Sequence, residues 1–163
     1  MVRRFPLLPA ALSVFLIAAA GCGSAVDLTQ ALVVEDLATG WHDAGIVEGN
    51  NKLVPSVSFK LKNTSNEKLV TLAVNAMFRR GTATEEWGSG FRIAAGSEGL
   101  APGTSTEDIV IHSPRGYTGS EPRVDMLKNS QFVDAKVELF AKYAANEWQR
   151  IGEYPVTREL RTP

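Results

Sequence analysis

Three segments of the chain alternate between apolar and polar residues, and this period of two constrains the fold more than any other feature. The segments are residues 54–63, 69–79 and 133–142. In the first of them Val57, Phe59 and Leu61 face one way, and serine and lysine residues face the other. Such alternation puts one side of the chain against a core and the other side in water, as in a half-buried β-strand. The pattern therefore predicts a protein built mainly of β-strands.

Turn-forming residues separate these segments and divide the rest of the chain into shorter pieces. Residues 63–66 and the Pro102-Gly103 pair are typical of turns, because Asn and Ser side chains bond their own backbone and Gly tolerates a positive φ. Further strands are expected at residues 30–36, 87–93, 105–112 and 148–157, a helical turn or two at 123–129, and loops at 38–51 and 113–122. We expect residues 54–63 and 69–79 to pair as a hairpin. About seven short strands separated by turns predict an all-β fold, a single immunoglobulin-like antiparallel β-sandwich with one short helix.

Composition agrees with one globular domain and excludes several classes of protein. The chain has 163 residues, of which 44% are hydrophobic and 21% charged, as in an ordinary globular protein. The formal net charge is -1, so the basic surface of a nucleic-acid-binding protein is not expected. The single cysteine excludes an intramolecular disulfide and a cysteine-based zinc site.

The N-terminal segment has the layout of a secretory signal. Arg3 and Arg4 supply positive charge, residues 5–20 are apolar apart from one serine, and small residues follow at 18–21. The stretch at 10–20, which follows the two prolines and contains the one serine, would form a helix of roughly 16 Å, whereas the hydrocarbon core of a bilayer is about 30 Å thick. A cleaved signal is therefore favoured over a membrane-spanning helix.

The sequence Ala19-Ala20-Gly21-Cys22 resembles the lipobox of bacterial lipoproteins, in which the signal is cut just before a cysteine that carries the lipid. The family usually has Leu where this chain has Ala19, while the other three positions fit. The only cysteine of the chain stands at the lipidation position. A plain secretory signal with a cysteine there by chance, and a twin-arginine signal, are the alternatives.

The resemblance implies a thioether-linked diacylglycerol on Cys22. Gly23 follows the cysteine where Asp would signal inner-membrane retention, so by analogy with Gram-negative lipoproteins the protein would be lipid-anchored in the bacterial cell envelope, at the outer membrane and facing the periplasm. The expected division of the chain is a lipoprotein signal peptide at 1–21, a lipidated tether at 22–29 and a β-sandwich domain at 30–163.

The layout of residues 53–111 resembles the small immunoglobulin-like modules of bacterial envelope proteins, the FxLYD type among them. A strand ends in Lys62-Asn63-Thr64-Ser65, a second strand and a variable hairpin follow, and a Pro-Gly turn at 100–105 leads into another strand. The Phe-x-Leu-Tyr-Asp signature itself is absent, because the matching strand ends Ala76-Met77-Phe78-Arg79. The resemblance implies a sandwich fold, and the family has no established enzymatic activity to carry over.

Few residues suggest catalysis or metal binding. His42 and His112 are the only histidines, and their spacing fits no metal-ligand motif. No serine stands in a Gly-x-Ser-x-Gly elbow, and the pair Glu85-Glu86 is typical of solvated hairpin charges. We therefore expect no catalytic residues, no metal site, no cofactor and no enzyme activity.

Three tryptophans, Trp41, Trp87 and Trp148, are candidate binding residues. On the rim of a sandwich their rings could stack on the apolar face of a sugar. In the other interpretation each ring closes an edge of the core. The arrangement of the three rings in space distinguishes the two interpretations.

A basic strip is the other candidate binding surface. It consists of Lys60 and Lys62 on the outward face of one strand and Arg79 and Arg80 at the end of the next. Residues 52–80 hold six bases and one acid, whereas residues 27–51 hold five acids and no base. Either the acidic segment covers the basic strip, or the strip meets an anionic headgroup, glycan or protein partner.

These observations together predict a lipid-anchored cell-envelope protein that acts as a non-catalytic binding or accessory module. Its expected partners are the membrane, through Cys22, and a protein of the envelope, and nucleic acid is not among them. The alternative is a glycan- or small-ligand-binding lipoprotein that serves an envelope transport system.

Overall fold

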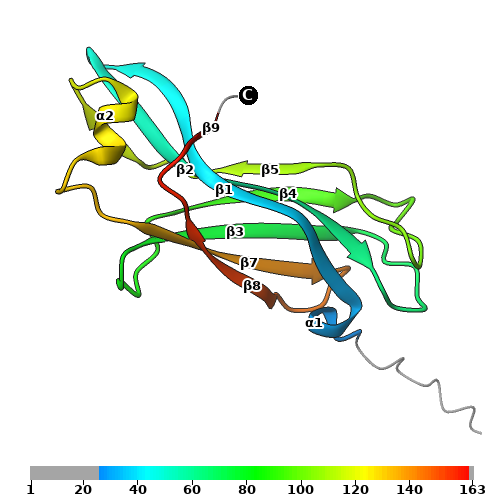
Figure 1. Ribbon diagram of the computed structural model, residues 1–163. Helices are drawn as coiled ribbons and strands as arrows, with labels where there is room; N and C mark the ends of the chain where they lie inside the picture. Colours follow the sequence, from blue (N-terminus) through cyan, green and yellow to red (C-terminus); the bar gives the residue numbers. More distant parts are fainter. Residues whose placement is uncertain (1–25, 162–163) are drawn as a thin grey trace, which may run out of the picture.

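Two β-sheets packed face to face make up residues 26–161, which are the residues that the computed structural model describes (Figure 1). One sheet, here called the first sheet, has the strand order β5-β2-β1-β9, with β6 also paired to β2; the second sheet has the order β4-β3-β7-β8. The elements are α1 (Leu28–Ala31), β1 (Leu32–Val47), β2 (Asn50–Asn63), β3 (Leu72–Arg80), β4 (Gly88–Ala95), β5 (Ile109–His112), β6 (Tyr117–Gly119), α2 (Arg123–Lys128), β7 (Ala135–Tyr143), β8 (Gln149–Val156) and β9 (Leu160–Arg161). All strand pairs are antiparallel except β1 with β9. The predicted all-β sandwich is confirmed, with two short helices in the described residues where one was expected.

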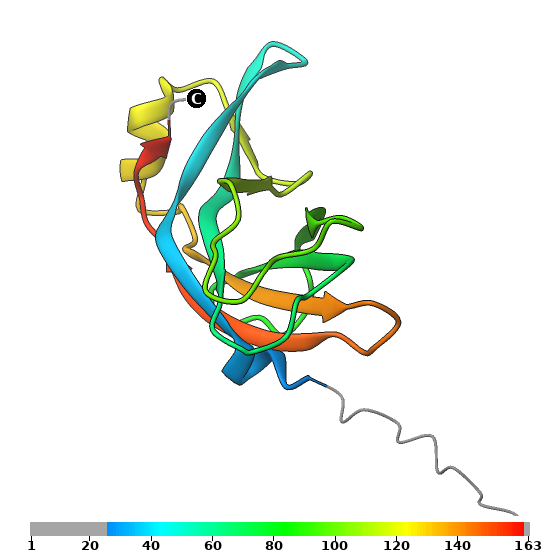
Figure 2. The same ribbon diagram turned by 90° about the vertical axis from the view of Figure 1, so that its right-hand side faces the viewer.

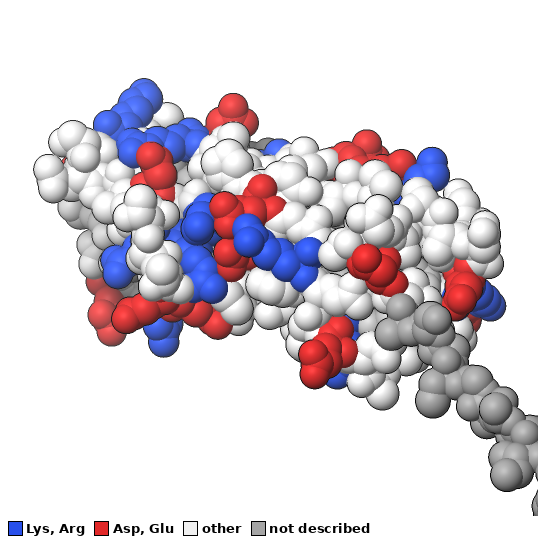
Figure 3. Space-filling view, turned by 90° about the horizontal axis from the view of Figure 1, so that it is seen from below, with Lys and Arg blue, Asp and Glu red and all other residues white. Residues whose placement is uncertain are grey.

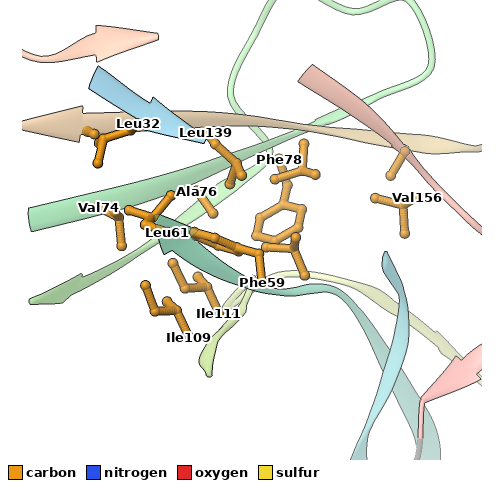
Figure 4. Close-up of a cluster of buried hydrophobic side chains, with 14 of the residues drawn as sticks. Leu32, Phe59, Leu61, Val74, Ala76, Phe78, Ile109, Ile111, Leu139 and Val156 are labelled. Atoms are coloured by element: carbon orange, nitrogen blue, oxygen red, sulfur yellow. The ribbon is translucent and has the colours of Figure 1, made fainter. Parts of the chain in front are cut away.

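The core lies between the two sheets and follows the alternation of the sequence. Val57, Phe59 and Leu61 of β2 are 0% exposed, as are Val74 and Phe78 of β3. Figure 4 shows side chains of β2 and β5 meeting those of β3 and β7. Full burial of one such aliphatic or aromatic side chain stabilises a fold by about 1.5–3 kcal/mol, so this layer holds the sheets together.

The prediction that residues 54–63 and 69–79 pair as a hairpin is wrong. These segments are β2 and β3, which are strands as predicted, but β2 belongs to the first sheet and β3 to the second. The chain crosses between the sheets at Asn63, which is 0% exposed. Its side-chain amide donates hydrogen bonds to the Glu67 carbonyl at 2.7 Å and the Leu100 carbonyl at 2.9 Å. Asn63 thus supplies hydrogen bonds to two backbone carbonyls at the crossing between the sheets, where the side chain of Asn63 is shielded from water.

The loop expected at residues 38–51 is also wrong, because β1 continues to Val47 and forms a tight hairpin with β2. Gly45 and Gly49 take positive φ angles of 85° and 79°, so these glycines serve a bulge and the hairpin turn rather than a loop. Of the strand expected at 30–36, residues 30 and 31 belong to the single turn of α1, and β1 begins at Leu32. Residues 38–47 have the composition of a loop, but pairing with β2 makes them a strand.

The other expected elements lie close to their predicted positions. α2 falls within residues 123–129, and β4, β7 and β8 match three of the predicted strands. The strand expected at 105–112 is confined to β5, and the loop expected at 113–122 contains β6.

The two helices mark opposite ends of the sandwich (Figures 1 and 2). At one end, Gln149 of β8 accepts a hydrogen bond from the Leu28 amide at 2.8 Å and donates one to the Val26 carbonyl at 3.2 Å. Leu28 falls in the predicted tether yet is 1% exposed, so it belongs to the folded domain. At the other end, the β1–β2 hairpin extends beyond the second sheet beside α2. The predicted signal and Cys22 lie outside the described residues.

Candidate functional site

A hollow of about 300 Å³ lies at the α2 end of the molecule. Its lining residues come from β6, α2 and the segments next to them: Tyr117, Thr118, Gly119, Ser120, Glu121, Met126, Asn129, Gln131 and Phe132. The volume is at the lower end of the range for small-molecule sites. The hollow is therefore a candidate for a ligand site in the described part of the chain.

Aromatic rings form the inner wall of this hollow. Phe132 packs edge-on against Trp41 with ring centroids 4.5 Å apart, and lies 4.6 Å from the ring of Tyr117. Tyr117 in turn lies 5.0 Å from Trp87. Trp41 is completely buried, whereas Tyr117 is half-buried and faces both the cluster and the hollow. A ligand in the hollow would thus meet an aromatic wall that the core holds rigid.

Polar groups also line the hollow. The side-chain nitrogen of Asn129 lies 3.4 Å from both carboxylate oxygens of Glu121. The side-chain oxygen of Asn129 accepts a hydrogen bond from the backbone N–H of Gln131 at 2.8 Å. Asn51 of β2 donates to the Glu121 carbonyl at 2.8 Å. Glu121 is the one charged side chain among the residues that the structure places around the hollow. A lining that combines aromatic rings with amide and carboxylate groups suits a small polar ligand that has an apolar face.

Two local features hold β6 and α2 against the first sheet. An added Cβ on Gly116 would lie 1.9 Å from the Leu53 carbonyl oxygen, so only glycine permits this approach of the chain to β2. Arg123 of α2 forms an ion pair with Asp43 of β1. The adjacent Arg123 guanidinium lowers the pKa of the Asp43 carboxyl below its usual value, helped by a hydrogen bond from the backbone amide of Gly45.

The C-terminal segment supports the aromatic wall from outside. The Arg158 guanidinium lies 5.4 Å from the Phe132 ring and donates a hydrogen bond to the Phe132 carbonyl at 2.8 Å. It also pairs with Asp134 at 2.6 Å. Phe132 is therefore held from both its ring and its backbone.

The three predicted tryptophans do not share a face. Trp41 and Trp87 come together, with ring centroids 6.1 Å apart, in the aromatic cluster. Trp148 is 41% exposed and lies beside Phe91 of the second sheet, immediately before β8. Tyr117 was missed by sequence reasoning, since a single aromatic residue in a Gly- and Pro-rich segment carries no pattern.

The basic strip does not form one surface. Lys60 and Lys62 lie on the outer face of the first sheet, where Lys60 pairs with Asp36 at 3.0 Å and Asp108 at 3.8 Å, and Lys62 pairs with Glu35 at 3.5 Å. The hydrogen bond with Asp36 raises the pKa of Lys60. Acids of residues 27–51 thus lie over these two lysines.

Arg79 and Arg80 lie at the end of β3 in the second sheet. Arg79 pairs with Glu138 at 3.0 Å, and the Arg80 guanidinium lies 5.4 Å from the ring of Trp87. Figure 3 shows blue and red side chains intermingled on the face seen from below. β2 and β3 are not neighbours, which is why the four basic residues are separated.

His42 and His112 meet although 70 positions separate them in the sequence. Their rings stack on the outer face of the first sheet with centroids 4.0 Å apart and an interplanar angle of 22°. Burial lowers the pKa of His112, and the nearby His42 and Arg92 lower it further. Within residues 26–161 no group of three or more His, Cys, Asp and Glu side chains is arranged to hold a metal ion.

Neither helix within residues 26–161 is long and apolar enough to cross a membrane.

Comparison with known proteins yields little. No protein-family model matches the chain, and no curated protein matches it. Among solved structures, the X-ray structure of Northeast Structural Genomics Consortium target SoR45 is similar, with a TM-score of 0.44 and 13% sequence identity. The match covers 80% of this chain and 89% of that chain. A similarity of this size carries no argument about function.

Proposed function

We propose that this protein is a lipid-anchored protein of the bacterial cell envelope and acts there as a non-catalytic binding module. The observation that carries the proposal is the position of the chain's only cysteine, Cys22, directly after Ala20-Gly21 and an apolar segment with two arginines before it. A diacylglyceryl group at Cys22 would supply two acyl chains, and two chains anchor a protein stably where one does not.

The start of the described fold is compatible with such an anchor. Only residues 23–25 stand between Cys22 and Val26, so the span is at most about 14 Å. The folded domain would remain close to the membrane surface, which raises its effective concentration for other anchored partners. The hollow, at the α2 end, would lie at the far end from the anchor.

The mass of the native polypeptide tests this proposal. We expect a chain that begins at Cys22 and is heavier than the unmodified sequence by at least a diacylglyceryl group. A Cys22→Ala variant placed behind an ordinary secretory signal should be recovered in the soluble fraction, whereas a Ser24→Ala variant of the native chain should stay with the membranes. A free thiol at Cys22, or a mature start site elsewhere, would refute the proposal.

The hollow favours a second candidate function, the binding of a glycan or another small polar ligand. Its lining combines the rings of Tyr117 and Phe132 with the carboxylate of Glu121, and this combination suits the apolar face and the hydroxyls of a sugar. Neutral mono- and disaccharides should then shift the NMR signals of residues around the hollow. Tyr117→Ala should abolish the shifts, and Asn146→Ala, at the other end of the second sheet, should preserve them. Unchanged spectra with every sugar would exclude this function.

A further inference from the structure

Apolar side chains are exposed on the outer face of the second sheet near α1. Phe91 and Ile93 of β4 are 50% and 55% exposed, and Trp148, which precedes β8, is 41% exposed. The rings of Trp148 and Phe91 pack edge-on with centroids 6.1 Å apart. The Lys142 ammonium lies 6.0 Å from the centre of the Trp148 ring. We call Phe91, Ile93, Lys142 and Trp148 the Trp148 patch.

The sheet itself assembles this patch from distant parts of the sequence. Ala73 of β3 pairs with Ile93 of β4 on one side and with Lys142 of β7 on the other. Ala73 alternates with the core residues Leu72 and Val74 and so faces outward, yet it is only 7% exposed. The larger side chains around Ala73 therefore cover its methyl group. The patch is a packed surface rather than a set of isolated residues.

Farther along the same face, charged side chains pair with one another. Glu138 of β7 pairs with Arg79 at 3.0 Å and lies 3.7 Å from Arg150, and Glu153 pairs with Lys136 at 3.4 Å. Burial alone would raise the pKa of Glu138, but the hydrogen bond and charge of Arg79 bring it below its usual value. These charged groups are partnered by ion pairs within the sheet, whereas the apolar side chains of the Trp148 patch are exposed to solvent. Contiguous exposed apolar residues of this kind mark an interaction site.

The chain enters the fold beside this patch. Trp148 is followed by Gln149, whose side chain bonds both Val26 and Leu28. β8 is an edge strand of the second sheet, so Val26, which accepts a hydrogen bond from Gln149, lies at an edge of this sheet. A membrane that held acyl chains on Cys22 would lie within about 14 Å of Val26. The surface that can reach the patch most readily is therefore the bilayer itself.

We propose that the Trp148 patch rests in the lipid–water interface of the membrane that holds Cys22. The inference depends on the proposed function, and it adds which face of the domain meets the lipid. A tryptophan ring suits this interface because it combines a large apolar surface with one polar N–H group. Lys142 can extend its ammonium group to a lipid phosphate while its methylene chain stays on the patch. The acyl chains supply the binding, and the patch sets the orientation, which leaves the hollow at the α2 end free.

Quenching of tryptophan emission tests this contact in the full lipidated chain. The protein is reconstituted into vesicles of equal parts zwitterionic and anionic phospholipid, with and without bromine on the acyl chains. Trp41 is buried in the core and Trp87 lies in the cluster, so we expect the brominated lipid to quench Trp148 alone. Trp148→Phe should therefore lose most of the quenching, and Trp87→Phe should retain it. Ile93→Ser, which changes an exposed position only, should weaken the quenching without changing the circular dichroism spectrum.

The outcomes separate this inference from the function on which it depends. A native chain with an unmodified Cys22 refutes the proposed function and with it the tether that this inference needs. A lipidated chain that floats with the vesicles but shows equal quenching in wild type and Trp148→Phe refutes the contact alone. Shielding of Trp148 from aqueous acrylamide that rises with protein concentration, in vesicles without bromine, would assign the patch to a second copy of the chain and also refute it.

Discussion

Replacement of Asn63 tests the crossing between the two sheets. The Asn63 amide makes two donations to backbone carbonyls, and its oxygen accepts from the Ser65 amide at 3.0 Å and the Ser65 hydroxyl at 2.7 Å. A hydrogen bond contributes about 1 kcal/mol net, and Ser65 is only half-buried and can turn to water. We therefore expect Asn63→Ala to lower the free energy of unfolding by about 2–3 kcal/mol.

Urea unfolding followed by tryptophan emission measures this loss. With a slope of about 2 kcal/mol per molar urea, the midpoint should fall by roughly 1–1.5 M. The matched control is Asn66→Ala, an exposed asparagine of the same turn, which should stay within about 0.5 kcal/mol of wild type. If Asn63→Ala is as stable as this control, the side chain does not hold the crossing and the reasoning is wrong.

Asn63→Asp sharpens the test because it keeps the shape and replaces the donor by an acceptor. The new carboxylate would face the carbonyls of Glu67 and Leu100, so its pKa in the folded protein should be raised. A raised pKa means that the folded state binds the proton more tightly, and stability then falls as the pH rises above about 3.9, the value in the unfolded chain. We expect Asn63→Asp to be less stable than Asn63→Ala at pH 7, with the difference shrinking on acidification. A difference independent of pH would contradict the assignment.

Three further substitutions test other contacts. Arg79→Met should destabilise by about 2 kcal/mol at pH 7, because it removes the nearest cation from the poorly exposed Glu138 carboxylate and leaves only Arg150, at 3.7 Å, beside it. Since the pKa of Glu138 is lowered in the fold, the pair stabilises above about pH 4.3, and the gap to wild type in urea unfolding should narrow below that pH. Burial lowers the pKa of His112, so its neutral ring favours the fold above about pH 6.5 and this stability is lost as the pH falls. His112→Phe should flatten the unfolding free energy between about pH 7 and 5, and an unchanged slope would show that another group titrates there. An added Cβ on Gly90 would lie 2.4 Å from the Ile111 side chain. Gly90→Ala should thus cost about 1–3 kcal/mol, seen as a lower Tm, and an unchanged Tm would mean that the two sheets do not approach so closely there.

Which side chains of a strand are buried could be predicted from the sequence, because alternation is a property of neighbouring residues. Val57, Phe59 and Leu61 are buried as the pattern indicates, and so are the matching positions of β3 and β7. The same alternation arises whether two strands pair with each other or lie in opposite sheets, so it could not show that β2 and β3 separate at Asn63. Composition likewise misled at residues 38–51, where a partner strand outweighs the preference of Gly-rich sequence for loops.

The candidate site depends more strongly on tertiary structure. Trp41 and Trp87 stood out in the sequence because tryptophan is rare, but the hollow is lined by Tyr117 and Phe132, which carry no local signal. The expectation of one basic strip failed for a related reason. Lys60 and Arg79 are close in sequence, but they lie on outer faces of different sheets and meet different acids.

The sequence by itself determined which residues turn inward, and it supplies the whole argument for an anchor at Cys22, since a signal and its cleavage position are read from a continuous stretch of chain. Tertiary structure decided which strands pair, which acids lie over Lys60, how Trp148 comes to lie beside Phe91, and where the hollow opens. The physical reason is the range of the interactions. Periodicity and cleavage motifs arise within about ten residues, whereas strand pairing and side-chain clusters join residues tens of positions apart, whose proximity exists only after the chain has folded.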